Sequence, residues 1–296
     1  MSHPVNLGLI SEGTNTWPLY VAQSLGFFER EGIELRVVVT GSSVKQQEDL
    51  IAGRFDIGFQ QADHVVRAVE RGHDLFIFMA HGRAPDLSLV AAPGTRTIGE
   101  LRGRTIAVDG ARTGYALLLR RLLRQEGLAE GEIAFGEFGG SRERFDAMKS
   151  GAAAASLLNP PFDARLASEG YPLLARINER YPGYPGSVMA ARRSWARAHA
   201  AVMQGFVRAY DAGYAWLQDP ANARQALALL PVRLDVARPA AERALEEFTA
   251  RARPQMTEQG LREVIDIVWE AEGHSRTKGE PARYMDLSYA AQALAA

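Results

Sequence analysis

The sequence contains no cysteine among its 296 residues. This absence excludes disulfide bonds, thiolate catalysis and metal sites built on cysteine. It does not identify a compartment, because a chain without cysteine is compatible with both oxidising and reducing surroundings. Whatever chemistry the chain performs must therefore come from its other side chains.

An excess of charge of either sign is also missing. The chain has 34 Lys and Arg against 35 Asp and Glu, which gives a formal net charge of -1. Binding to nucleic acid normally requires a marked basic excess, so we expect no nucleic-acid partner. No apolar run approaches the roughly 20 residues that a membrane-spanning helix needs, so we expect no membrane insertion.

The first residues lack the features of a secretory signal. The segment MSHP has neither a basic region nor an apolar core, and the first strand is predicted to begin near Val5. We expect a periplasmic or cell-surface protein if a signal has been removed from the natural chain. We expect a cytoplasmic protein if Met1 is the natural start.

Several common catalytic and cofactor motifs are absent as well. The chain has no GxSxG elbow, phosphate-binding loop, HExxH motif or GxGxxG motif. Its six histidines are scattered. His73 and His81 flank one predicted strand, and surface positions are favoured for them over a metal site. We therefore expect no metal and no cofactor.

The sequence does contain a regular alternation of predicted strands and helices. VNLGLI precedes a helix around residues 18 to 30, IELRVVVT precedes a helix in SSVKQQEDLIAG, and FDIGFQ precedes DHVVRAVERG. Apolar runs of strand length that alternate with segments of helical spacing predict mostly parallel sheets flanked by helices.

A second series of the same kind follows. It contains the predicted strands RTIAVDG, IAFGEFG and ASLLN, and from Trp195 onward the chain is nearly all helical. We predict an α/β fold with two lobes and two crossings between them. Lobe 1 comprises residues 1–90 and 189–296, and lobe 2 comprises residues 91–188.

Small polar residues gather where predicted strands end and helices begin. Ligands of open α/β sheets bind at these carboxyl ends, where helix N-termini offer free N–H groups. The predicted ligand-binding residues from these junctions are Asn15, Thr16, Trp17, Ser42, Ser43, Gln60, Gln61, His64, Thr113, Gly114, Tyr115, Ser141, Arg142, Asn159 and Phe162. The alternative is plain helix capping by Thr16, Ser42, Asp63, Thr113 and Ser141.

Three of the predicted site residues keep specific alternatives. Trp17 could stack on a ligand, or it could pack into the core against the first helix. His64 stands in the first turn of a predicted helix, where it could bind a ligand or simply face solvent. Arg142, together with Arg83 before the predicted crossing, could pair with an acidic group or be an ordinary surface arginine.

Four longer stretches carry a family resemblance. They are PLYVAQSLGFFEREGIEL, LIAGRFDIGFQQADHV, LRGRTIAVDGARTGYALLLRRLLRQEGL and FDAMKSGAAAASLLNPPFDARLASEG. In this order they resemble the type 2 periplasmic binding proteins. Within them they resemble the nitrate, sulfonate, taurine and thiamine-precursor (NMT1/THI5-like) branch of the substrate-binding proteins of ABC transporters.

The resemblance implies a two-lobed fold in which two mixed sheets are flanked by helices and joined by a double-strand hinge. It also implies a solute-binding protein that closes on a small organic anion or heteroaromatic ligand, such as a sulfonate, a carboxylate or a pyrimidine. An ABC permease would be its partner if the chain is exported. The ligand itself is not specified, because the loops that select it vary within the family.

The same fold also resembles cytoplasmic enzymes, which gives a second hypothesis. A decarboxylase or other lyase acting on a small aromatic or carboxylic acid would use His64, Glu12 and Arg83 as acid, base and anion clamp. The binding protein is favoured, because these three residues form no recognisable catalytic motif.

Overall fold

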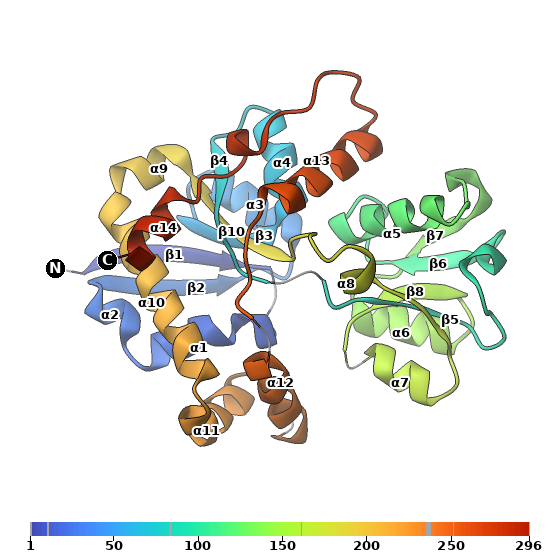
Figure 1. Cartoon of the computed structure of the whole chain (residues 1–296), viewed down its shortest axis with the longest axis horizontal. Helices are drawn as coiled ribbons and strands as arrows, with labels where there is room; N and C mark the ends of the chain where they lie inside the picture. Colours follow the sequence, from blue (N-terminus) through green and yellow to red (C-terminus); the bar gives the residue numbers. More distant parts are fainter. Residues whose placement is uncertain are drawn as a thin grey trace. The chain divides into compact units, whose positions relative to one another are not determined.

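The computed structural model describes residues 2–10, 12–82, 85–160, 162–234, 238–250 and 252–295. Its internal contacts divide the chain into two compact units. Unit 1 comprises Met1–Gly82, Gly186–Met256 and Glu280–Ala296, and unit 2 comprises Arg83–Pro185 and Thr257–Gly279. Figure 1 follows the chain through both units by colour.

Unit 1 is built on a mixed five-stranded sheet. Its strands are β1 (His3–Leu9), β2 (Ile33–Val39), β3 (Ile57–Gln61), β4 (Leu75–Ala80) and β10 (Ser187–Arg192), in the order β2-β1-β3-β10-β4. Strand β1 is parallel to both of its neighbours, whereas β10 is antiparallel to β3 and β4. The carboxyl ends of β1, β2 and β3 therefore meet at one edge of the sheet.

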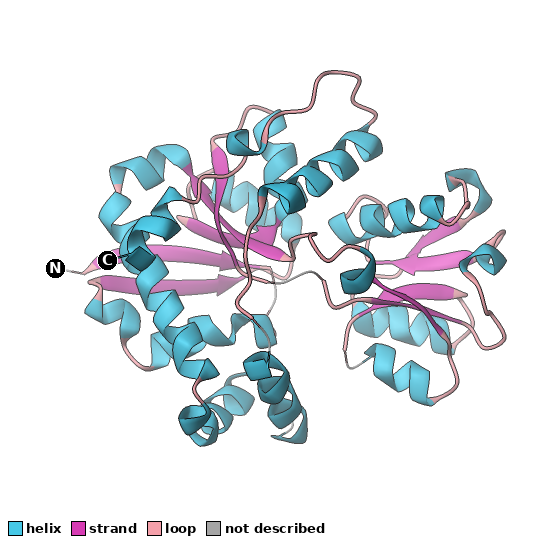
Figure 2. Ribbon diagram, viewed as in Figure 1, coloured by secondary structure: helices cyan, strands magenta, loops and turns pink. Residues whose placement is uncertain are grey.

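Helices cover both faces of this sheet (Figure 2). Side chains of alternate strand positions, such as Leu7 and Phe59, form a buried cluster with Phe206 and Tyr210. The helices of unit 1 are α1 (Trp17–Ser24), α2 (Phe27–Arg30), α3 (Ser43–Ile51), α4 (Ala62–Glu70), α9 (Arg193–Ala198), α10 (Ala200–Gln218), α11 (Ala223–Leu234), α12 (Arg238–Ala250) and α14 (Ser288–Ala295), with the 3-10 helices η1 (Thr14–Thr16), η4 (Pro220–Asn222) and η5 (Pro281–Arg283). No helix among the described residues is long and apolar enough to cross a membrane.

Unit 2 is built on a second mixed five-stranded sheet. Its strands are β5 (Ser88–Ala91), β6 (Thr105–Val108), β7 (Ala134–Glu137), β8 (Ala155–Leu158) and β9 (Leu173–Arg176), in the order β7-β6-β8-β5-β9. Strand β6 is parallel to β7 and β8, and β5 is antiparallel to β8 and β9. The carboxyl ends of β6, β7 and β8 form the corresponding edge of this unit.

The helices of unit 2 are α5 (Gly114–Gln125), α6 (Ser141–Lys149), α7 (Phe162–Ser168), α8 (Ile177–Arg180) and α13 (Glu258–Glu272), with the 3-10 helices η2 (Ile98–Leu101) and η3 (Glu130–Glu132). Their apolar faces pack on the sheet, as the buried cluster of Val90, Phe145 and Leu158 shows. The predicted α/β fold with two mixed sheets flanked by helices is confirmed.

The division of the chain differs from the predicted lobes in the position of α13. The prediction assigned residues 189–296 to lobe 1, but α13 packs on α5 of unit 2. Arg124 forms an ion pair with Glu270 at 3.4 Å. A Cβ atom on Gly260 would lie 2.0 Å from the carbonyl oxygen of Gly183, so only glycine permits this close approach.

Candidate functional site

The structure places the predicted ligand-binding residues at the carboxyl ends of strands in both units. In unit 1 they follow β1, follow β2, or span the end of β3 and the start of α4. In unit 2 they follow β6, β7 and β8. Arg83 lies outside the described residues. This placement agrees with the position at which open α/β sheets bind ligands.

The loop after β1 holds Trp17 in the core of unit 1. The Trp17 side chain is fully buried in the large hydrophobic cluster, which is the alternative that the sequence left open for it. Thr16 is also buried, and its hydroxyl donates a hydrogen bond to the carbonyl oxygen of Gly13 at 2.7 Å. Asn15 is exposed. Of these three residues, Asn15 presents its side chain to solvent.

Helix capping accounts for two of the five residues proposed as caps. The Ser42 side chain accepts a hydrogen bond from the backbone N–H of Lys45, and the Thr113 side chain accepts one from Ala116, each at 3.3 Å. Such caps satisfy N–H groups that the first turn of a helix leaves unpaired. The other three proposed caps, Thr16, Asp63 and Ser141, cap no helix by a side-chain hydrogen bond.

The paired glutamines at the end of β3 differ in exposure. Gln60 is fully buried, and its amide nitrogen and oxygen have no hydrogen-bond partner within the described part of the chain. Gln61 is partly exposed, and its amide nitrogen lies 3.5 Å from the hydroxyl of Ser187. Gln61 is therefore the more accessible of the two for a ligand.

His64 lies beside a buried ion pair in the first turns of α4. Asp63 is fully buried, and its Oδ2 atom lies 2.9 Å from Nη2 of Arg67 and 3.9 Å from Nε2 of His64. The His64 side chain is 11% exposed, so its imidazole is only marginally accessible. Glu12 accepts a hydrogen bond from the hydroxyl of Tyr20. Within the described residues, no hydrogen bond joins His64 to Glu12.

A polar network joins the loops after β7 and β8 in unit 2. Ser141 and Asn159 are hydrogen-bonded through their side chains. Arg144 donates from Nη2 to the hydroxyl of Ser141 at 3.1 Å, and from Nη1 to the carbonyl oxygen of Gly139 at 2.9 Å. The network fixes the N-terminus of α6 against the end of β8.

Arg142, which the sequence predicted as a cation for an acidic ligand group, lies beside this network. It is exposed and stacks on the ring of Phe162. Its guanidinium carbon lies 5.1 Å from the centre of the Phe162 ring. The buried cation is instead Arg144, which sequence reasoning missed. A usable signal was its spacing, because residues three apart on a helix share a face, and Arg144 follows Ser141 by that interval.

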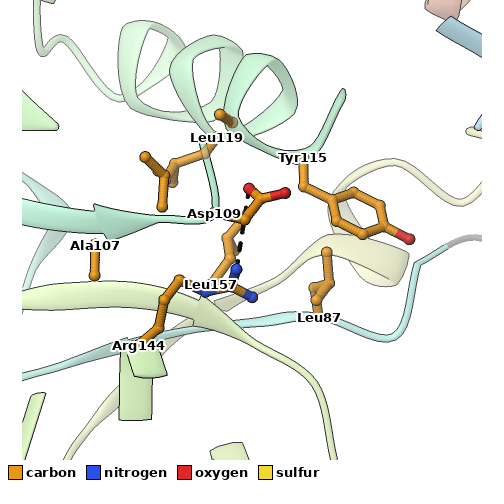
Figure 3. A pocket seen from close by; sticks show the side chains of 9 residues that line it. Leu87, Ala107, Asp109, Tyr115, Leu119, Arg144 and Leu157 are labelled. Carbon is orange, nitrogen blue, oxygen red and sulfur yellow. Dashed lines mark ion pairs between the residues drawn. The ribbon is translucent and has the colours of Figure 1, made fainter. Parts of the chain in front are cut away.

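Arg144 also lines a pocket that lies wholly within unit 2 (Figure 3). Figure 3 shows Arg144 facing Asp109, with the ring of Tyr115 beside Asp109. The lining residues are Leu87, Ala107, Val108, Asp109, Tyr115, Ala116, Leu119, Arg144 and Leu157. Burial lowers the pKa of the Arg144 guanidinium, and the negative charge of Asp109 opposes this shift. Of the predicted residues, Tyr115 lines the pocket, whereas Asp109 was missed.

Sequence reasoning also predicted a wrong position for His81, which lies directly after β4. The predicted surface position is wrong, because His81 is buried in unit 1 and its ring centre lies 4.1 Å from that of Phe59. Its Nδ1 atom lies 3.1 Å from the hydroxyl of Tyr210. Burial lowers the pKa of His81 to about 3, so its imidazole is neutral at physiological pH. Within the described residues, no group of three or more His, Cys, Asp or Glu is arranged to hold a metal ion.

Comparisons with known proteins connect this geometry to a family. A family model described as NMT1/THI5 like matches residues 13–223. A search of curated proteins found no match.

Solved structures share the fold over nearly the whole chain. The alkanesulfonate-binding protein SsuA from Xanthomonas axonopodis pv. citri, bound to MOPS, has a TM-score of 0.75 and 17% identity over 96% of this chain and 98% of that one. The periplasmic aliphatic sulphonate binding protein SsuA from Escherichia coli has a TM-score of 0.75 and 18% identity over 96% and 92%. The periplasmic nitrate-binding protein NrtA from Synechocystis PCC 6803 has a TM-score of 0.76 and 12% identity over 99% and 89%.

Proposed function

The chain belongs to the NMT1/THI5-like family, and from that premise we propose that it is a solute-binding protein for a small organic acid or heteroaromatic compound. The observation that carries the proposal is the agreement of fold along nearly the whole chain with proteins whose names describe sulfonate or nitrate binding. The polar residues at the strand ends of both units support it, because such edges bind ligands in open α/β sheets.

The proposed ligand contacts are the side chains that remain accessible at these edges. In this proposal Thr16, Trp17, Gln60 and Gly114, which are buried, support the loops rather than contact the ligand. The accessible set consists of Asn15, Ser42, Ser43, Gln61, His64, Thr113, Tyr115, Ser141, Arg142, Asn159 and Phe162. N–H groups at the helix N-termini near them favour an acidic group on the ligand.

We further propose that an ABC permease is the partner and that the protein acts in the periplasm or at the cell surface. The names of the structural neighbours support this proposal. Fractionation of the native cell, followed by detection of the chain in each fraction, tests it. Recovery in the periplasmic fraction is the expected result, and recovery only in the cytoplasm would contradict it.

The enzyme hypothesis retains one supporting observation. The Nε2 atom of His64 lies 3.9 Å from the buried carboxylate of Asp63, which is longer than a hydrogen bond, and a histidine close to a carboxylate can serve as an acid or base. A lyase or decarboxylase acting through His64 would lose turnover in His64→Ala. Unchanged turnover in that variant, or no turnover of any candidate by the natural protein, would exclude it.

A thermal-shift screen tests the proposed function. The purified chain is heated with small sulfonates, carboxylates, pyrimidines and aromatic diacids, and each hit compound is recovered and identified by mass spectrometry. A ligand present at a hundred times its Kd adds about 2.7 kcal/mol of stability if it binds only the folded protein. We expect at least one stabilising ligand, recovered unchanged. A ligand recovered in converted form would indicate an enzyme.

A further inference from the structure

Two histidine rings lie together in unit 1, at the end of the sheet opposite the proposed ligand edge. His3 is the first residue of β1, and His199 lies between α9 and α10. Their ring centres are 4.9 Å apart, and both residues are half-buried. Figure 1 shows that β1 begins at the N-terminus and runs away from it, so His3 and the loop after β1 lie at opposite ends of the strand. The histidine pair is therefore separate from the proposed solute site.

The His199 ring is held in one orientation by two contacts with Trp195. Its Nδ1 atom lies 2.9 Å from the carbonyl oxygen of Trp195, and its ring stacks on the indole with ring centres 5.0 Å apart. A carbonyl oxygen can only accept, so Nδ1 donates, and in the neutral imidazole Nε2 then carries the lone pair. Histidines that bind metal ions commonly donate their other ring N–H to a backbone carbonyl or a carboxylate in this way. The fold therefore orients His199 to bind through Nε2.

The remaining ring nitrogens of the pair have no hydrogen-bonding partner. Within the described residues, neither Nε2 of His199 nor the ring of His3 forms a hydrogen bond or an ion pair. His64 and His274 differ in this respect, because a carboxylate oxygen lies 3.9 Å from the first and 3.6 Å from the second. The pair thus offers nitrogen lone pairs that the protein itself does not use.

The spacing of the two rings fits a shared metal ion. Imidazole nitrogen binds zinc at about 2.0–2.1 Å, and two imidazoles at tetrahedral angles then have ring centres about 5 Å apart. The 4.9 Å between His3 and His199 agrees with this separation. Plain packing of aromatic rings gives similar separations. The orientation of His199 and the unused nitrogens are the observations that favour a metal ion over packing alone.

We propose that His3 and His199 bind one divalent transition-metal ion of the zinc, nickel or copper class, for which imidazole is a suitable ligand. Water completes the coordination, because within the described part of the chain no group of three or more His, Cys, Asp or Glu is arranged to hold a metal ion. The ion links the start of β1 to the junction of α9 and α10 and so stabilises unit 1. This inference goes beyond solute binding and does not depend on it.

Calorimetric titration with Ni²⁺ tests the inference. The protein is prepared without a polyhistidine tag and is stripped of metal with a chelator before the titration. We expect one ion to bind per chain and to raise the midpoint of thermal unfolding. His3→Gln and His199→Asn should each lower the affinity by at least about tenfold, which is the loss that even a change in the outer shell of a metal site causes.

His199→Asn is chosen because it separates the metal ligand from the structural contact. The amide N–H of asparagine can take the place of the Nδ1 donor and keep the hydrogen bond to Trp195, whereas Nε2 is lost. The variant also leaves the amino-terminal segment unchanged. Circular dichroism should show that both variants are folded.

His274→Gln is the matched control. His274 also lies against an indole, that of Trp269, with ring centres 5.1 Å apart, but among the described residues no second imidazole accompanies it. This variant should keep the affinity of the natural protein for Ni²⁺.

Three outcomes would overturn the inference. Absence of Ni²⁺ binding would show that the two rings only pack together. Unchanged affinity in His199→Asn or His3→Gln would show that the ion binds adventitiously elsewhere, and loss of binding in His274→Gln would place the site in unit 2. Each of these results leaves solute binding intact, because the thermal-shift screen tests that function separately.

Discussion

His81 is a histidine that the fold keeps neutral. It lies in unit 1, directly after β4, between the ring of Phe59 and the hydroxyl of Tyr210. Because burial lowers its pKa from 6.5 to about 3, the folded protein does not protonate it in mildly acidic solution, whereas the unfolded chain does. Proton uptake by the unfolded chain alone shifts the equilibrium toward unfolding as the pH falls.

We predict that His81 makes the protein less stable at pH 5 than at pH 7. Between the unfolded pKa of 6.5 and the folded pKa of about 3, each fall of one pH unit lowers the free energy of unfolding, because only the unfolded chain takes up the proton. The loss attributable to His81 between pH 7 and pH 5 is about 2 kcal/mol. Urea unfolding at several pH values measures it, and His81→Gln should show a fall that is smaller by this amount.

His73 provides the control for this measurement. It precedes β4 and is exposed, so His73→Gln should keep the pH dependence of the natural protein. The free energies of unfolding of His81→Gln and of the natural protein could instead fall by the same amount between pH 7 and pH 5. That result would show that burial of His81 does not perturb its titration.

The role of a single residue could be predicted when its contacts are with residues close to it in the sequence. Ser42 and Thr113 were identified as possible caps because a cap and its helix are adjacent in the sequence. The roles of Arg144 and Asp109 depend on loops after three different strands, so sequence spacing alone did not reveal them. Trp17 stayed ambiguous, because an indole fits both a ligand contact and a core.

At the scale of elements, α1 and α10 pack unusually closely in unit 1. Gly213 lies inside α10, where glycine is normally unfavourable, by about 1 kcal/mol relative to alanine. A Cβ atom at this position would lie 2.3 Å from the carbonyl oxygen of Pro18 and 3.0 Å from the Cβ of Ala22, both in α1. The glycine is therefore explained by the distance between the two helices.

We predict that Gly213→Ala destabilises the protein despite its better helix propensity. The clash involves backbone, which cannot rotate away as a side chain can, and overpacking typically costs about 1–3 kcal/mol. The expected net loss is about 1–2 kcal/mol, since propensity offsets part of that cost. The midpoint of urea unfolding measures it.

Gly131→Ala is the matched control, because a Cβ atom there has no heavy atom within 4 Å. It should change the stability by no more than about 0.5 kcal/mol. If Gly213→Ala is as stable as the natural protein, α1 and α10 can separate without cost and the packing argument is wrong.

The strands and helices themselves were largely predictable from the sequence. The two series of βα units follow from the change between apolar runs and helical spacing, which reflects local geometry. The helix expected around residues 18 to 30 is divided into α1 and α2, because Gly26 adopts a left-handed conformation with φ of 70°. A single glycine inside a helical pattern does not reveal such a break.

At the scale of the molecule, the chain passes between the two units four times rather than the predicted two. The passages fall after Gly82, Pro185, Met256 and Gly279. The first two correspond to the predicted crossings, although the first lies before β5 because this strand pairs with β8 and β9 of unit 2. The other two result from α13, whose packing on α5 could not be read from its amphipathic pattern, since that pattern gives no partner.

We predict that a saturating ligand reduces the radius of gyration in solution. The family resemblance implies that the units close on the solute, because its contacts are complete only in the closed form. Small-angle X-ray scattering with and without a hit from the ligand screen measures the change, and a non-binding compound serves as control. An unchanged scattering curve at saturation would contradict closure.

The central claim, that the chain binds a small solute and releases it unchanged, is tested most directly by isothermal titration calorimetry of the natural protein with a hit from the screen. The account predicts a saturable heat with 1:1 stoichiometry, after which the signal returns to the baseline. A heat flow that continues after each injection would reveal turnover, and the absence of saturable heat for every hit would show that no such solute binds.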